Sequence, residues 1–456
     1  MKRAVLLLVL LLSTPALGQT PPGAADPSKL EIQYSQFTLP NGLTVILHED
    51  HSVPVVSVNV WYHVGSARER PGRTGFAHLF EHLMFMGSGH VGPGLFDEWL
   101  EGVGGTNNGS TTNDRTNYWI NLPSNALELA LFLESDRMGY LLESMTPQTV
   151  DAQRDVVKNE RRQSHENRPY GMAEIVLGEM LYPEGHPYRW PVIGYMPDLT
   201  AASYEDVVAF YKTYYAPSNA SLVVAGDIDP AVTRALVEKW FSDVKPGTRP
   251  DPVAIPGVAL RDVQKKTITD RVQLPRLFIA WLTPPMYAPG DAALDVLSSV
   301  LAGGKNGRLY KRLVYDMQIA QSVEAAQNSN VLSSFFLIDV MPRPGHTIEE
   351  VQRVIDEEVE LLQREGPTDH EVQRAINQFE ASFYGRMERV GGFNGKADLL
   401  NAYYANTGDP DWFNEDLARY RALSPSDVRA AVQKFLPAGR RVELTVAPEP
   451  AVNAAR

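Results

Sequence analysis

The chain has 456 residues, of which 44% are hydrophobic, so it can bury more than one core and should divide into domains. Its formal net charge is −13 and no basic stripe is present to neutralise phosphates, which argues against nucleic acid as a partner. It contains no cysteine, which excludes disulfides and a lipid-modified cysteine as a membrane anchor.

The first 18 residues have the pattern of a cleaved signal peptide. Lys2 and Arg3 give a basic start, residues 4–12 are uniformly apolar, and Ala16-Leu17-Gly18 is a small-residue cleavage site. Nine apolar residues are too few to span a bilayer, so no membrane anchor is expected. Export without disulfides indicates a periplasmic or secreted bacterial protein. Residues 19–30 are rich in Pro, Gly and Ala and are predicted to be disordered.

Strands near 43–49 and 55–63 are expected to precede a helix over 75–86, with Thr74 as its N-cap and Gly87 as its stop. Apolar residues recur in this helix at helical spacing and form one stripe: Phe76, Leu79, Phe80, Leu83 and Met84. At about 100° per residue, His78, Glu81 and His82 lie on the opposite side. One face is therefore predicted to pack while the other carries chemistry.

His78 and His82, four residues apart on one helix face, can both reach one metal ion. With Glu81 they form the H-x-x-E-H order of the inverzincins. Zinc in such a site raises the acidity of a water molecule, and the glutamate can accept that water's proton. The motif predicts metal-assisted hydrolysis; the alternative is two unrelated histidines on a solvated helix face.

Catalytic zinc usually has three protein ligands, so a third is needed. A helix over 147–165, with Thr146 as N-cap and Pro147 at its first position, offers Glu160. Glu160 shares a face with Gln153, Val156 and Val157, which predicts that it points inward. Two alternatives are Glu166 as the ligand, or Glu160 as a surface carboxylate paired with Arg161 or Arg162.

The remaining pattern predicts two similar α+β domains, over 31–244 and 258–449, joined by a Pro-rich linker at 245–257. Each domain is expected to be a mostly antiparallel sheet with helices packed on one face. In the first domain, helices near 124–144 and 203–214 and a strand at 221–225 complete the set. In the second, which lacks an H-x-x-E-H motif, we expect two long helical segments and the following elements: a strand at 276–281, helices at 291–302 and 307–315, strands within 320–341, and a strand at 442–446.

Together these motifs resemble the M16 metallopeptidases, the family that includes pitrilysin, insulysin and the mitochondrial processing peptidase. The resemblance covers most of the chain. It depends on H-x-x-E-H and on five other segments in the family's order: residues 37–43 (an opening strand and turn), 104–111 (similar to Gly-Gly-x-x-Asn-Ala-x-Thr), 154–162, 185–188 and 219–227.

The resemblance implies that His78, His82 and Glu160 bind one Zn²⁺ per chain and that Glu81 is the general base. It also implies that Asn108 and Gly109 lie along an exposed sheet edge that holds the backbone of a peptide substrate. Many members have a second glutamate seven residues before the ligand; here that position is Gln153, which can affect metal affinity or ligand orientation.

Family members also place an Arg and a Tyr, seven residues apart, near the substrate from a second half of the enzyme. The matching positions here are Val314 and Gln321, although Arg308 and Tyr315 have the same spacing in another register. The sequence therefore predicts a zinc endopeptidase for unfolded or short peptides that acts as the catalytic subunit of a heterodimer. The partner would be a related subunit with the Arg/Tyr pair. A homodimer is the alternative assembly, and a non-catalytic scaffold subunit is the alternative function.

Overall fold

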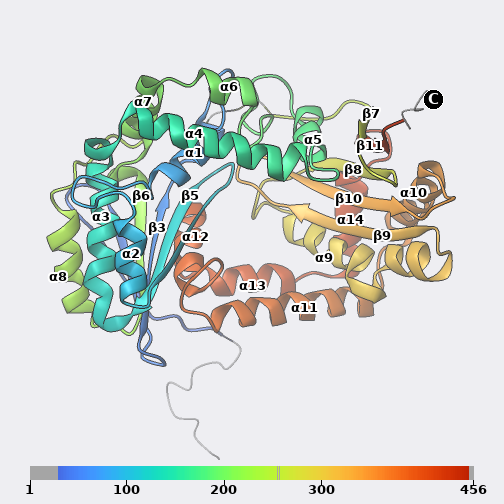
Figure 1. Ribbon diagram of the computed structural model, residues 1–456. Helices are drawn as coiled ribbons and strands as arrows, with labels where there is room; N and C mark the ends of the chain where they lie inside the picture. The colour runs from blue at the N-terminus through green and yellow to red at the C-terminus, as the bar shows by residue number, and fades with distance from the viewer. Residues whose placement is uncertain (1–28, 254, 256, 451–456) are drawn as a thin grey trace, which may run out of the picture. The chain divides into compact units, whose positions relative to one another are not determined.

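The computed structural model describes residues 29–253, 255 and 257–450 (Figure 1). The predicted signal peptide and nearly all of the segment 19–30 lie outside the described residues. Within the described part, no helix combines the length and the apolar character that a membrane span requires.

The first sheet has six strands in the order β1-β2-β6-β3-β5-β4, and only β2 and β6 pair in parallel. Because β4 pairs only with β5, its other side is a free edge. The strands are β1 (Ser35–Thr38), β2 (Thr44–Glu49), β3 (Val55–Tyr62), β4 (Thr106–Thr111), β5 (Thr116–Pro123) and β6 (Ala220–Gly226).

One face of this sheet packs against helices of the first half. In β3, Val58 and Val60 face that core, whereas Asn59 and Trp61 alternate to the other face. The helices of this half are α1 (Phe76–Leu83), α2 (Leu95–Gly102), α3 (Leu127–Ser144), α4 (Pro147–Arg161), α5 (Ala173–Leu181), α6 (Met196–Ala201), α7 (Tyr204–Tyr214) and α8 (Pro230–Phe241).

The second sheet has five strands in the order β7-β11-β8-β10-β9, with β7 and β11 parallel. Its strands are β7 (Gln264–Asp270), β8 (Arg276–Thr283), β9 (Ala320–Asn328), β10 (Ser334–Pro342) and β11 (Val442–Pro448). A separate core forms beneath it against helices of the second half. These helices are α9 (Asp291–Ala302), α10 (Ile348–Glu365), α11 (Asp369–Met387), α13 (Phe413–Arg421) and α14 (Pro425–Phe435), with a π-helical turn at Tyr310–Asp316.

Each half also contributes one helix to the opposite sheet. α5 of the first half packs on β8 and β11, where Leu177 and Leu181 meet Phe278 and Leu444 in a third core. α12 (Lys396–Thr407) of the second half packs on β3 and β6 of the first sheet (Figure 1). The second face of each sheet is therefore covered by the other half of the chain.

The predicted α+β fold with two mostly antiparallel sheets is confirmed. The predicted bounds of the motif helix were wrong: α1 begins at Phe76 after Gly75 and ends at Leu83. Thr74 does not cap it, because its hydroxyl instead donates to Asp198 at 2.7 Å. The sequence reading also omitted several elements altogether, among them α2, α5, α8, α12, α13 and α14.

Candidate metal centre

α1 presents both histidines of the motif toward α4. Its apolar stripe is buried in the first core: Phe76, Leu79, Phe80 and Leu83 are each at most 3% exposed. This packing fixes the rotation of the helix, so that His78 and His82 face the other way, with ring centroids 4.9 Å apart.

α4 brings Glu160 to this pair. The Thr146 side chain caps the helix by accepting from the Thr149 amide, as predicted. Of the two valines on the predicted inward face, Val157 is fully buried, one turn before Glu160, whereas Val156 is 44% exposed. The Glu160 side chain remains 42% exposed.

The structure brings the three predicted ligands together. His82 Nε2 lies 3.1 Å from one Glu160 carboxylate oxygen and His78 Nε2 lies 3.6 Å from the other. Within the described residues these three form the one group of metal-binding type, with ligand atoms all within 4.8 Å of one another. Glu166, the alternative ligand, instead forms an ion pair with Arg161.

The protonation states in this group suit a metal. Burial lowers the pKa of His78 to about 4, so its imidazole is neutral and has a free lone pair. The hydrogen bond with His82 lowers the pKa of Glu160, which keeps its carboxylate ionised. Two imidazoles and one carboxylate are the donor set of catalytic zinc sites with two histidines and a glutamate, so the residues present fit Zn²⁺.

Glu81 lies beside the histidines but is directed to the edge strand β4. Thr111 Oγ1 donates to its carboxylate at 2.7 Å, and burial raises the pKa of Glu81. A Cβ added at Gly109 would lie 3.2 Å from Glu81 Cγ and 3.0 Å from the Tyr118 ring. A side chain at this position would be in tight contact with both neighbours, so glycine gives β4 room to pass close to the motif helix.

Asn108 and Gly109 lie on β4, as the resemblance implied. The Asn108 side-chain oxygen accepts from the Gly109 amide at 2.8 Å, which satisfies one backbone donor of an edge strand. The amide nitrogen of Gln153 lies 2.8 Å from the Met86 sulfur.

The residue that caps the N-terminus of α1 was not predicted from the sequence. The N-cap, Gly75, has no side chain to cap the helix, and the Glu69 carboxylate takes that role, accepting from the Gly75 and Ala77 amides at 2.8 Å each. Glu69 is nearly fully buried, and burial raises its pKa to about 8. A capping carboxylate six residues before the N-cap has no local sequence signature, so only the fold could reveal it.

A glycine contact joins the start of α1 to the loop that follows α5. A Cβ on Gly194 would lie 2.6 Å from the Gly75 Cα, so the two backbones touch. Arg161, directly after Glu160, donates from Nε to the Gly194 carbonyl at 3.0 Å. This loop therefore connects the two helices that carry the candidate ligands.

Comparisons with known proteins agree with this architecture. Residues 44–182 match the family described as Insulinase (Peptidase family M16), and residues 201–379 match the family described as Peptidase M16 inactive domain. The chain is 30% identical over 412 residues to the zinc protease PqqE of Helicobacter pylori. The aligned region covers 88% of this chain and 90% of that protein. An uncharacterized zinc protease of Streptomyces coelicolor is 26% identical, covering 90% of this chain and 88% of that protein.

Solved structures show the same fold. The crystal structure of a protease from Helicobacter pylori has a TM-score of 0.83 at 27% identity, covering 92% of this chain and 100% of that one. The periplasmic protease PqqL of Escherichia coli has a TM-score of 0.74 at 16% identity, covering 92% of this chain and 48% of that one. The chain belongs to the M16 family of zinc metallopeptidases.

Proposed function

We propose that this chain is a zinc-dependent endopeptidase for unfolded or short peptides, with His78, His82 and Glu160 as ligands and Glu81 as general base. The observation that carries the proposal is the convergence of both histidines and Glu160 from two helices, with the Glu81 carboxylate directed toward the free edge of β4. A scaffold subunit would have no need of this combination.

In this proposal the chain's own residues bind and orient the peptide and move protons. The free edge of β4 pairs with an extended substrate backbone, and Asn108 releases the Gly109 amide to it. Bound Zn²⁺ supplies Lewis-acid chemistry, because it draws electron density from the oxygens that react. Glu81, held by Thr111, accepts a proton from the attacking water and returns it to the leaving amine.

The match to a family called inactive does not argue against catalysis. That match covers residues 201–379, whereas the ligand group and Glu81 lie within residues 44–182. A non-catalytic scaffold subunit remains the alternative, and it predicts zinc binding without peptide turnover.

The proposed enzyme is the catalytic half of a heterodimer. Arg308 donates to both oxygens of Glu371, at 2.6 and 2.7 Å, so it is engaged within this chain. This supports the register in which Val314 and Gln321 occupy the Arg and Tyr positions.

We also propose that the protein is exported to the periplasm or the medium, because residues 1–18 have the pattern of a signal peptide. Determining the N-terminal sequence of the mature protein tests this proposal.

Substrate form provides the test of the function. Because β4 can pair only with an extended chain, the zinc-loaded enzyme, assembled with its partner subunit, should cut an unfolded polypeptide and leave a stably folded, loop-free domain intact. Removing zinc with a chelator should stop cleavage, and adding zinc back should restore it. Cleavage that continues without zinc, or equal cleavage of the folded domain, would contradict the proposal.

A further inference from the structure

α12 of the second half places a buried aspartate against the first sheet. Asp398 is 7% exposed, and its Oδ1 accepts from Asn117 at 2.8 Å, from Trp61 at 2.9 Å and from Asn59 at 3.3 Å. Its other oxygen accepts from the Asn394 amide at 2.8 Å. Four neutral N–H groups, three of them from side chains on β3 and β5, therefore depend on one carboxylate from the other half.

The contacts continue from Asp398 to the free edge. Asn117, held by Asp398 through its amide nitrogen, accepts from Ser110 Oγ on β4 at 2.7 Å through its oxygen. Arg115 lies over the Trp61 ring at 5.2 Å and donates to the Ser110 carbonyl at 2.7 Å. Two chains of contacts therefore connect Asp398 to Ser110, one through Asn117 and the other through Trp61 and Arg115.

Ser110 lies between the two residues of β4 that meet the proposed base. Gly109 passes against the Glu81 side chain, and Thr111 donates to its carboxylate. A shift of Ser110 along or away from β5 would therefore move the peptide-pairing backbone and the hydroxyl that holds Glu81 at the same time.

The tip of the β4–β5 hairpin is also attached to the second half. Asp114 accepts from Tyr188 at 2.5 Å and from the Val331 amide at 3.1 Å, and the Leu332 amide donates to the Tyr188 hydroxyl at 2.9 Å. Val331 and Leu332 lie between β9 and β10. The hairpin is thus held by the second half on its face and at its end.

We propose that Asp398 is a positioning residue for peptide binding, which gives the second half, without ligands of its own, a part in the reaction. It fixes β4 through Asn117 and Ser110 in the register that an extended peptide and Glu81 both require. The proposal rests on the proposed function, because it takes β4 as the substrate edge.

Asp398→Asn tests this proposal in a Glu81→Gln background, where peptide binds without being cut. The amide keeps the size of the side chain but removes the charge and turns one acceptor into a donor. Binding of a fluorescein-labelled random-coil peptide, followed by anisotropy, should weaken by about tenfold or more, since small misplacements of binding groups have effects of this order. Zinc affinity should not change, because Asp398 contacts neither α1 nor α4.

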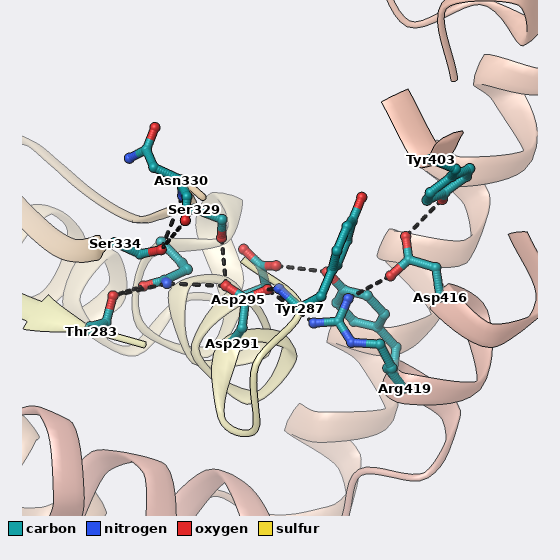
Figure 2. A network of polar contacts seen from close by, with 12 residues as sticks. Thr283, Tyr287, Asp291, Asp295, Ser329, Asn330, Ser334, Tyr403, Asp416 and Arg419 are labelled. Atoms are coloured by element: carbon teal, nitrogen blue, oxygen red, sulfur yellow. Dashed lines mark hydrogen bonds and ion pairs between the residues drawn. The ribbon is translucent and has the colours of Figure 1, made fainter. Parts of the chain in front are cut away.

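Asp291 offers a matched control in the same half. It is 2% exposed and accepts from Tyr287, Ser329, Gln327 and Arg419, all within the second half (Figure 2). Asp291→Asn should lower the melting temperature by removing a buried charge partner, but it should leave the peptide Kd unchanged.

Amide hydrogen exchange of residues 106–122 gives a second readout that needs neither zinc nor peptide. Asp398→Asn should speed exchange in this hairpin, while Asp291→Asn should not. Ser110→Ala, which removes the hydroxyl that contacts Asn117 and Arg115 but leaves the contacts of Asp398 intact, should weaken peptide binding in the same direction but less. If Asp398→Asn lowers stability yet leaves both the peptide Kd and hairpin exchange at the parent values, the residue is merely structural and the proposal fails. If the parent enzyme assembled with its partner subunit binds no peptide, the proposed function fails, and hydrogen exchange still shows whether Asp398 holds the β4–β5 hairpin in place.

Discussion

His78, His82 and Glu160 are constrained to different degrees by their surroundings. Their side chains are 12%, 25% and 42% exposed, so the carboxylate has the most freedom of the three. Glu160 closes the site from a second helix. In the proposed site its charge would therefore contribute to orienting the group as well as to binding the metal.

Replacing Glu160 by Gln should weaken zinc binding by more than about 100-fold, beyond the range typical of outer-shell partners, and should abolish hydrolysis. The amide oxygen is neutral and a poor ligand for Zn²⁺. Competition with a chromogenic chelator measures the affinity. Glu166→Gln is the control, because Glu166 binds Arg161 rather than the candidate site. Wild-type zinc affinity in Glu160→Gln would place the third ligand elsewhere.

For individual residues, the sequence predicted the features of the candidate site that depend on local contacts. The i, i+4 spacing of His78 and His82 was sufficient to predict a shared face, and the helix phase correctly placed Val157 on the buried side of α4. It failed for Val156, which is exposed because α4 buries only a narrow stripe around Val150 and Val157. The contact of Gln153 is tertiary as well: its amide nitrogen lies 2.8 Å from the Met86 sulfur, which no local pattern indicates.

At the scale of elements, α1 is a short helix that depends on residues outside itself. His78 is the third residue of α1, in the first turn, where backbone amides lack partners within the helix. Glu69 supplies two of those partners, and the Gly75–Gly194 contact fixes the entry of the chain. The direction of His78 thus depends on a carboxylate that does not touch it.

We expect Glu69→Ala to lower zinc affinity by roughly 10- to 100-fold, the range measured for outer-shell partners of metal ligands. The variant leaves the Gly75 and Ala77 amides buried without an acceptor, which should loosen the first turn of α1. Thr347→Ala, which removes the N-cap of α10, is the matched control: it should lose about 1 kcal/mol of stability and keep its zinc affinity. Equal zinc affinities in both variants would show that the cap does not position His78.

For the whole molecule, the main feature is the exchange of helices α5 and α12 between the two halves. The sequence predicted two mostly antiparallel sheets but not this exchange. α12 buries residues on several sides, including Asp398 and Asn401, so it has no single apolar stripe to mark its packing partner. Its contacts with β3 join residues 339 positions apart and those with β6 join residues 180 positions apart, beyond the reach of local patterns.

The proposed assembly predicts that this chain alone has little peptidase activity and that a related subunit with the Arg/Tyr pair restores it. Arg308→Ala should lower the melting temperature through loss of the Glu371 pair but leave kcat/KM of the assembled enzyme unchanged. Activity measurements on the chain with and without the subunit that co-purifies from its native source test this. Full activity of the chain alone would favour the homodimer. Loss of activity in Arg308→Ala at unchanged stability would indicate that Arg308 faces substrate.

The most direct test of the proposed mechanism is turnover of an unfolded peptide by Glu81→Gln and wild-type enzyme at equal zinc content, each assembled with the partner subunit. Glu81 donates no ligand atom to the candidate site, so the variant should hold one zinc per chain, as wild type should, while hydrolysis falls by orders of magnitude. Near-normal turnover in the zinc-loaded variant would contradict the assignment of Glu81 as the base.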